Sequence, residues 1–312
     1  IYYFFNEYVL IEQSKFIKEL LPFAAQYHRY YGEFESYFKL KNRLLINLNH
    51  EAQLRNIDIS EVKFELYAYS DNKDKKNKML KAIKDEVAKE NIQRIKELKK
   101  VFSKKKVLIM GPSKITNSIK LEKFDLIALA NTKLIGSFNK KVIDDSKIVM
   151  FVNLGYYYRN EIRLRNNINN VAAIFVKPMI DSSFPKFIMP NKLMYNDYGP
   201  MGMQNMIYSI YAGEAKSIYV TGVTGYLGDE IYRDGIKTYR DNFQHYSNNI
   251  RRHEPISNFC FIKNFVDLGL CSGDETFLKI FNNDVYRYCI SLDKLYSNYI
   301  FKRINNSKLH SK

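Results

Sequence analysis

The sequence predicts an α/β protein in which an N-terminal helical region precedes a Rossmann-like, doubly wound and mostly parallel sheet. Two observations support this prediction. After residue 105, short apolar and β-branched runs alternate with polar or helical stretches. The first hundred residues instead carry apolar side chains at helical spacing and contain a single glycine, Gly32. Near-continuous apolar runs are typical of strands that are buried on both faces, as in a parallel sheet.

Six segments are expected to form strands. They are Lys106–Met110, Asp125–Ala130, Lys147–Asn153, Val171–Val176, Ser217–Gly222 and, with the weakest pattern, Tyr288–Ser291. Residues 202–212 are expected to form a helix ahead of the fifth strand. This alternation of strand and helix is the pattern of a doubly wound sheet.

The region before residue 104 is predicted to be helical, with one interruption. Apolar residues recur at helical intervals in residues 1–31 and 34–56, and again between Leu80 and Phe102 among lysines and glutamates. The polar segment Asp71–Lys78 is predicted to be a loop or linker. We therefore divide the chain into a helical region (1–103), an α/β domain (104–292) and a basic tail (293–312). The tail is either a basic helix lying on acidic lipid or a frayed terminus.

Charge and cysteine content narrow the class of partner and the compartment. The 312 residues hold 49 Lys and Arg against 33 Asp and Glu, a net charge of +16. This excess favours an anionic partner, whether nucleotide, acidic glycolipid, nucleic acid or membrane surface. Three cysteines without a CxxC pair give no disulfide framework, and no apolar run is long enough to cross a bilayer. We expect a cytoplasmic protein, with peripheral contact at the inner face of the cytoplasmic membrane left open.

Small and amide side chains stand where several of the predicted strands end. Gly111, Pro112 and Ser113 follow the first strand, where open α/β sheets bind ligands. Neither GxGxxG nor GxxxxGK[ST] is present, so a dinucleotide or P-loop site is not supported. The turn either offers backbone N–H groups to a phosphate or is purely structural. Asn131 and Asn153, at the ends of the next two strands, either bind a nucleotide or cap ordinary turns.

The segment after the fifth strand carries the residues most suggestive of catalysis. Thr221 and Gly222 end that strand, and Tyr226 and Tyr232 follow six residues apart. Their phenols could donate hydrogen bonds to a departing phosphate in place of a metal ion, or they could be packing residues. His253 stands between Arg252 and Glu254, and a histidine near its ordinary pKa can act as a general base.

The other histidines are weaker candidates. His245 is the alternative base, and His28, His50 and His310 are scattered through the chain. None of them shows the spacing of metal ligands.

In their order along the chain, these motifs resemble the bacterial lipooligosaccharide sialyltransferases of glycosyltransferase family 42. The family's Gly-Asn-Gly-Pro-Ser turn is matched by residues 109–113, and its Cys-Asn and Tyr-Asn-Pro strand ends by Ala130-Asn131 and by residues 152–154. A Ser-Gly helix start is matched by Met201-Gly202. Residues 218–226 and Tyr232 keep the spacing of the family's tyrosine segment, and His253 precedes a helix as its base does. The resemblance covers about residues 105 to 290.

The resemblance implies an inverting, metal-independent transfer of sialic acid, or a related ulosonic acid, from a CMP-sugar to a bacterial lipooligosaccharide or capsule glycan. The fold would be a GT-A-like sialyltransferase variant. His253 would be the base, and Tyr226 and Tyr232 would stabilise the leaving phosphate. The residues implied to bind the nucleotide sugar are Gly111, Pro112, Ser113, Asn131, Asn153, Gly202, Thr221 and Gly222. The partners would be the donor and a glycan or glycolipid acceptor, without metal or nucleic acid, and a homo-oligomer is left open.

Three positions depart from the family pattern and keep other functions open. Met110, Met201 and Thr224 stand where the family has asparagine, serine and aspartate. The donor could therefore be CMP-Kdo or another activated sugar. The chain could also be a degenerate relative that binds nucleotide or glycan without turnover. A basic nucleic-acid or membrane-binding protein is the third alternative, because of the net positive charge.

Overall fold

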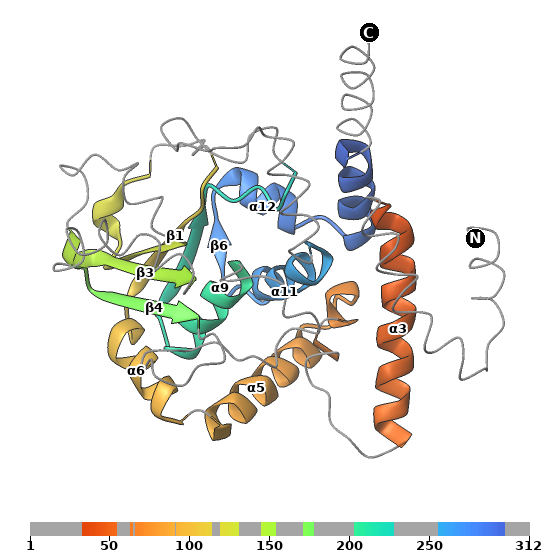
Figure 1. Cartoon of the computed structure of the whole chain (residues 1–312), viewed down its shortest axis with the longest axis horizontal. Helices are drawn as coiled ribbons and strands as arrows, with labels where there is room; N and C mark the ends of the chain where they lie inside the picture. Colours follow the sequence, from red (N-terminus) through yellow and green to blue (C-terminus); the bar gives the residue numbers. More distant parts are fainter. Residues whose placement is uncertain are drawn as a thin grey trace, which may run out of the picture.

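A computed structural model of the chain describes residues 33–54, 63–64, 66–90, 92–113, 119–130, 145–153, 171–177, 203–227 and 255–296. These residues form an α/β, Rossmann-like fold around one six-stranded parallel sheet (Figure 1). The strands are β1 (Lys106–Met110), β2 (Leu126–Ala130), β3 (Ile148–Asn153), β4 (Ala173–Lys177), β5 (Ser217–Thr221) and β6 (Ser272–Gly273). Their order is β4-β3-β2-β1-β5-β6, and every pairing is parallel. The predicted fold class is confirmed at this level.

Five of the six predicted strands are present, and the sixth prediction is wrong. Tyr288–Ser291 lies in a helix that spans residues 285–296. Its buried apolar residues recur every three or four positions, which is the period of a helix; they are Val285, Tyr288, Cys289, Leu292 and Tyr296. The last strand in the described part of the chain is instead β6, whose two residues are too few to show any strand pattern.

Most of the described helices lie where the sequence predicts them, and the segment near residue 75 is an exception. Besides the helix of residues 285–296, the labelled α-helices are α3 (Phe34–Leu54), α5 (Lys73–Glu90), α6 (Ile92–Phe102), α9 (Met203–Ala212), α11 (Pro255–Asp267) and α12 (Glu275–Phe281). Short 3-10 turns are η1 (Tyr67–Tyr69), η2 (Leu121–Lys123) and η4 (Asp145–Lys147). The prediction of a helix at 202–212 is confirmed by α9. The predicted amphipathic helix between Leu80 and Phe102 is divided between α5 and α6. None of the described helices is both long and apolar enough to cross a membrane.

The predicted loop at Asp71–Lys78 is wrong, because α5 begins at Lys73. The Oδ1 atom of Asn72 accepts a hydrogen bond from the backbone N–H of Lys75 at 2.9 Å, which satisfies one of the open donors of the first turn. The polar residues of this segment are therefore the solvent face and the start of a helix.

One hydrophobic core joins the sheet to the helices before it. The inward residues of the central strands, such as Val107, Ile109 and Val149, belong to the same buried cluster as Leu98 and Phe102 of α6. The aromatic rings of Phe102, Phe151 and Phe175 lie 5.1 to 6.3 Å apart and fix α6 on β3 and β4. The same cluster contains Phe34, Tyr37, Phe64 and Leu80. The described N-terminal helices thus share the core of the sheet.

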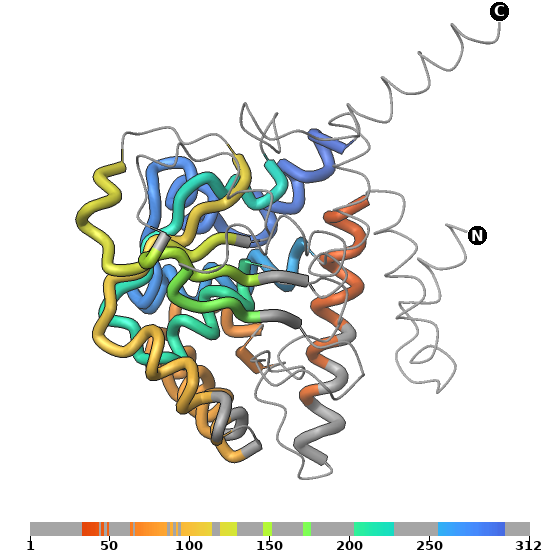
Figure 2. Tube along the Cα trace, turned by 60° about the vertical axis from the view of Figure 1, so that its left-hand side comes forward, coloured from red at the N-terminus to blue at the C-terminus, as the bar shows by residue number. Residues whose placement is uncertain are grey.

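The N-terminal end of α3 meets the helix of residues 285–296, although the two are far apart in sequence (Figure 2). The carboxylate of Asp293 accepts hydrogen bonds from the backbone N–H groups of Phe34 and of Glu35, the latter at 3.0 Å. Burial raises the pKa of the Asp293 carboxyl, and the two backbone hydrogen bonds oppose that rise. The rings of Phe34 and Tyr296 meet edge to face at 5.9 Å. A side chain near the C-terminus thus caps the first described helix.

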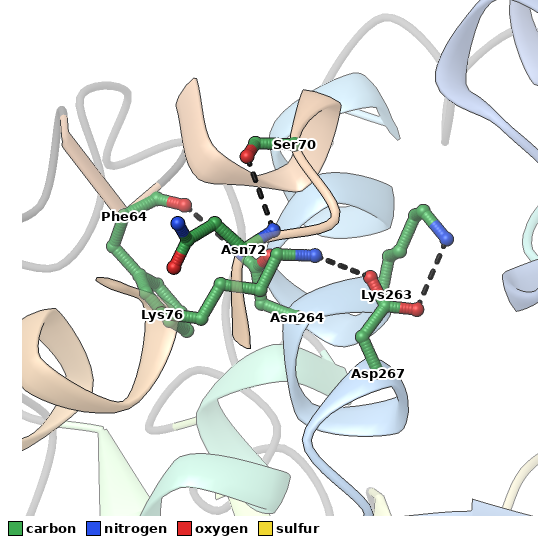
Figure 3. Close-up of polar contacts among 7 residues, drawn as sticks. All are labelled: Phe64, Ser70, Asn72, Lys76, Lys263, Asn264 and Asp267. Atoms are coloured by element: carbon green, nitrogen blue, oxygen red, sulfur yellow. Dashed lines mark hydrogen bonds and ion pairs between the residues drawn. The ribbon is translucent and has the colours of Figure 1, made fainter. Parts of the chain in front are cut away.

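A second polar contact fastens α5 to α11 (Figure 3). Lys76 is 1% exposed, and its Nζ lies 2.5 Å from Oδ2 of Asp267, which also pairs with Lys263 at 3.1 Å. One turn away, Nδ2 of Asn264 donates to the carbonyl of Phe64 at 2.5 Å. The α11 helix, which begins two residues after His253, is therefore held by residues that precede the sheet.

We predict that Asp267→Asn destabilises the fold strongly. It leaves the ammonium group of Lys76 buried without its counter-charge, and breaking a buried pair on one side typically costs about 3 kcal/mol or more. The matched control is Asp284→Asn, which removes an exposed partner of Arg287 at 3.2 Å and should cost far less. Urea unfolding of both variants measures the difference. Equal losses for the two variants would contradict the role given to Lys76.

Candidate functional site

The order of the strands identifies where a ligand would bind. The chain proceeds from β1 through β2 and β3 to β4 on one side of the sheet and then crosses to β5 and β6 on the other. The direction of winding therefore reverses between β1 and β5. In open α/β sheets, ligands bind beyond the carboxyl ends of the strands at such a switch point.

Most of the predicted binding residues fall at this edge of the sheet. Gly111 directly follows β1, Thr221 is the last residue of β5, and Gly222 comes next. Asn153 is the last residue of β3 and is in register with Lys177 of β4. Asn131 follows the last residue of β2 and lies outside the described residues. The backbone positions of Gly111, Thr221, Gly222 and Asn153 are therefore at the carboxyl edge of the sheet, as the sequence predicts.

The turns after β1 and β5 interlock. The N–H of Gly111 donates to the carbonyl of Thr221 at 2.7 Å, and the N–H of Ser113 donates to the carbonyl of Gly222 at 2.9 Å. A Cβ atom at Gly111 would lie 2.2 Å from the Gly222 oxygen, so only glycine allows this approach.

This interlock changes the role expected for the Gly-Pro-Ser turn. Its two N–H groups donate to protein carbonyls, and Pro112 has none. The side chain of Ser113 is buried as well. The backbone of this turn therefore does not present its N–H groups to a phosphate, and its clear role is to join the two strands that flank the switch point.

The structure adds one residue that the sequence did not single out, Asp274. It is 2% exposed and stands between β6 and α12. Its Oδ2 atom accepts from the Thr221 hydroxyl at 2.6 Å and from the N–H of Gly222 at 3.2 Å, and its Oδ1 accepts from the N–H of Phe277 at 2.9 Å. A buried carboxylate requires such donors.

The sequence contains part of the signal for Asp274, because an Asp ahead of an apolar-periodic segment is a helix N-cap pattern. Its reach to Thr221 depends on the pairing of β6 with β5, which no local pattern reveals. Thr221, expected to bind the nucleotide sugar, is fully buried and donates its hydroxyl to this carboxylate.

The loop after β5 has an unusual backbone. Gly222, Gly225 and Tyr226 have φ angles of +65°, +53° and +67°. The N–H of Leu227 donates to the carbonyl of Thr224 at 2.8 Å, and the hydroxyl of Tyr288 donates to the carbonyl of Gly225 at 2.8 Å. Left-handed φ is uncommon for residues other than glycine and is frequent at functional sites. Tyr226 is half-buried against the core, so it has both a packing face and an accessible face.

Charge and burial around β5 affect two further groups. Burial, and then the charge of Asp274, raise the pKa of the Tyr219 phenol. Burial raises the pKa of the Cys271 thiol to about 12, which keeps it protonated and unreactive at neutral pH. All three cysteines are described, and each is a buried thiol. Among the described residues, no three His, Cys, Asp or Glu side chains gather closely enough to hold a metal ion.

Several predicted site residues lie outside the described part of the chain. They are Tyr232, His253, Gly202 and Asn131. Gly202 immediately precedes α9, and His253 precedes α11 by two residues. The helices α9 and α11 pack against each other.

No family model, no curated protein and no solved structure matches this chain. The family resemblance therefore depends on the ordered motifs and their spacing.

We predict that Thr221→Val lowers the free energy of unfolding by about 1–3 kcal/mol, because the near-isosteric valine leaves the buried Asp274 carboxylate short of a donor. Thr276→Val, the same change at a half-buried position of α12, should cost about 0.5 kcal/mol or less. Chemical denaturation measures both. Equal stability of the Thr221→Val and Thr276→Val proteins would show that the hydrogen bond from Thr221 to Asp274 does not stabilise the fold.

Proposed function

We propose that this chain is an inverting, metal-independent glycosyltransferase that moves sialic acid, or a related ulosonic acid, from a CMP-sugar to a bacterial surface glycan, on a GT-A-like variant of the fold. The observation that carries the proposal is the strained, anchored loop bearing Tyr226 at the carboxyl edge of the switch point. It is the segment in which the family resemblance keeps its tyrosine spacing.

The donor would lie along this edge. The turns after β1 and β5 are joined at this edge by the close contact of Gly111 with Gly222. Asn153, and Asn131 after the neighbouring strand, would supply amide hydrogen bonds to the base, sugar or phosphate. The net charge of +16 favours an anionic donor and an acidic acceptor.

The residues divide the chemistry between them. His253 would take the proton from the acceptor hydroxyl as that oxygen forms its bond to the anomeric carbon. The bond from the anomeric carbon to the CMP phosphate breaks, and its electron pair stays on the phosphate oxygen. The hydroxyls of Tyr226 and Tyr232 would stabilise that phosphate. Alignment of donor and acceptor and this charge stabilisation supply most of the rate for an oxocarbenium-like transition state.

The departures from the family leave the donor sugar open. Met110 is 2% exposed within β1, which assigns it to packing. Thr224 is half-buried at the loop, where a changed side chain would act on the sugar. CMP-Kdo is therefore the second donor to consider.

We predict that CMP binds in the micromolar-to-millimolar range without magnesium, as measured by isothermal titration. Among CMP-, UDP- and GDP-sugars, only CMP-linked donors should be hydrolysed. CMP binding without hydrolysis of any donor would identify a degenerate binder. No response to CMP, together with DNA binding that falls steeply with salt, would replace the proposal with a nucleic-acid-binding function.

We predict that His253→Ala abolishes transfer and leaves the affinity for CMP nearly unchanged, because the base acts on the acceptor. The double change Tyr226→Phe and Tyr232→Phe should slow turnover by about two orders of magnitude, because it removes donors to the leaving phosphate. Steady-state kinetics and CMP titration of folded variants measure both effects. Turnover equal to wild type in either variant removes the assigned role from those residues.

A further inference from the structure

The loop of residues 222–227 is held at two points by residues that follow it in the sequence. We propose that Asp274 and Tyr288 are positioning residues that hold this loop, and through it Tyr226, in the geometry that turnover needs. For its catalytic consequence this inference rests on the proposed function; for the structural coupling it does not.

The loop needs such support because of its own backbone. Three of the five residues from Gly222 to Tyr226 have positive φ, and one of them is a tyrosine. A residue with a Cβ pays a conformational cost in this region. Such a conformation persists only when the surrounding structure over-determines it.

Asp274 holds the start of the loop. It accepts from the Thr221 hydroxyl and from the N–H of Gly222, while its own N–H donates to the carbonyl of Val220 at 2.9 Å. Its other carboxylate oxygen caps the first turn of α12. One buried side chain therefore couples the end of β5 to the start of α12.

Tyr288 holds the middle of the loop. Its hydroxyl donates to the carbonyl of Gly225 at 2.8 Å, next to Tyr226. The ring of Tyr288 is 2% exposed and stacks on Phe259 of α11 at 4.1 Å between ring centroids. A Cβ atom at Gly225 would lie 3.1 Å from the side chain of Ile280, so the loop also lies closely on α12. Packing of its ring thus fixes the position of the Tyr288 hydroxyl.

The two contacts have a consequence for catalysis. Tyr226 would contact the leaving phosphate, while Tyr288 and Asp274 would act only by fixing its position. A displacement of about 1 Å in a reacting group is enough to slow catalysis severely. Removing the hydroxyl of Tyr288 should therefore affect turnover more than it affects CMP affinity.

The test is Tyr288→Phe, which removes one oxygen and keeps the stacked ring. Its matched control is Tyr286→Phe on the same helix, where the exposed hydroxyl donates to Glu35 at 3.1 Å, away from the loop. Hydrogen exchange of peptides covering residues 219–227 should quicken about fivefold in Tyr288→Phe, as expected for the loss of one hydrogen bond. It should be unchanged in Tyr286→Phe. With a CMP-sugar that the wild-type protein hydrolyses, the kcat of Tyr288→Phe should fall about tenfold, while its Kd for CMP stays within about twofold of wild type.

The outcomes separate the two proposals. Unchanged exchange in a folded Tyr288→Phe protein overturns the positioning role, whatever its activity. Faster exchange with kcat equal to wild type overturns the catalytic consequence. If the wild type hydrolyses no CMP-sugar, the proposed function fails and the exchange experiment still decides whether Tyr288 holds the loop. Should Tyr288→Phe fail to fold, Asp274→Asn tests the first contact by the same exchange measurement.

Discussion

The interlock between the ends of β1 and β5 is the constraint on which the candidate site depends. Two backbone hydrogen bonds, from Gly111 to Thr221 and from Ser113 to Gly222, join the strands on either side of the switch point. They exist because glycine at position 111 lets the Gly222 carbonyl approach within a distance that any Cβ would forbid. The loop after β5, which carries Tyr226, begins at this contact.

The contacts around the interlock extend it into the rest of the fold. Asp274 ties the end of β5 to α12, and Tyr288 ties the following loop to the last described helix. That helix in turn caps α3 through Asp293. The α11 helix, which follows His253, is held from the N-terminal side by Lys76. The helices before residue 103 therefore contribute to the scaffold of the site, and their core is continuous with the sheet.

Local residue patterns in the sequence were sufficient to predict five of the strands and the residues at their ends. Five strands are continuous apolar runs, and a parallel sheet makes such runs conspicuous. The placement of Gly111, Asn153 and Gly222 at one edge follows from parallel pairing alone. The apolar run at Tyr288–Ser291 was misread, because a four-residue apolar run cannot distinguish a strand from a buried helix; the helical period shows only over residues 285–296.

Other features depend on partners that are distant in sequence. Lys76 looks like part of a solvated charge run, yet it is buried against Asp267, 191 residues away. Asp274 looks like a simple helix cap until β6 pairs with β5. The N–H groups of the Gly-Pro-Ser turn looked open to a phosphate, and only the approach of β5 shows that they are occupied. Tertiary pairing decides each of these cases.

The most direct test is a crystal structure of the chain with CMP bound. We predict the nucleotide at the carboxyl edge between β1 and β5, with the phenol of Tyr226 facing its phosphate and the imidazole of His253 across the same crevice. A nucleotide bound elsewhere, or His253 on the opposite side of the sheet from the Gly-Pro-Ser turn, would contradict it.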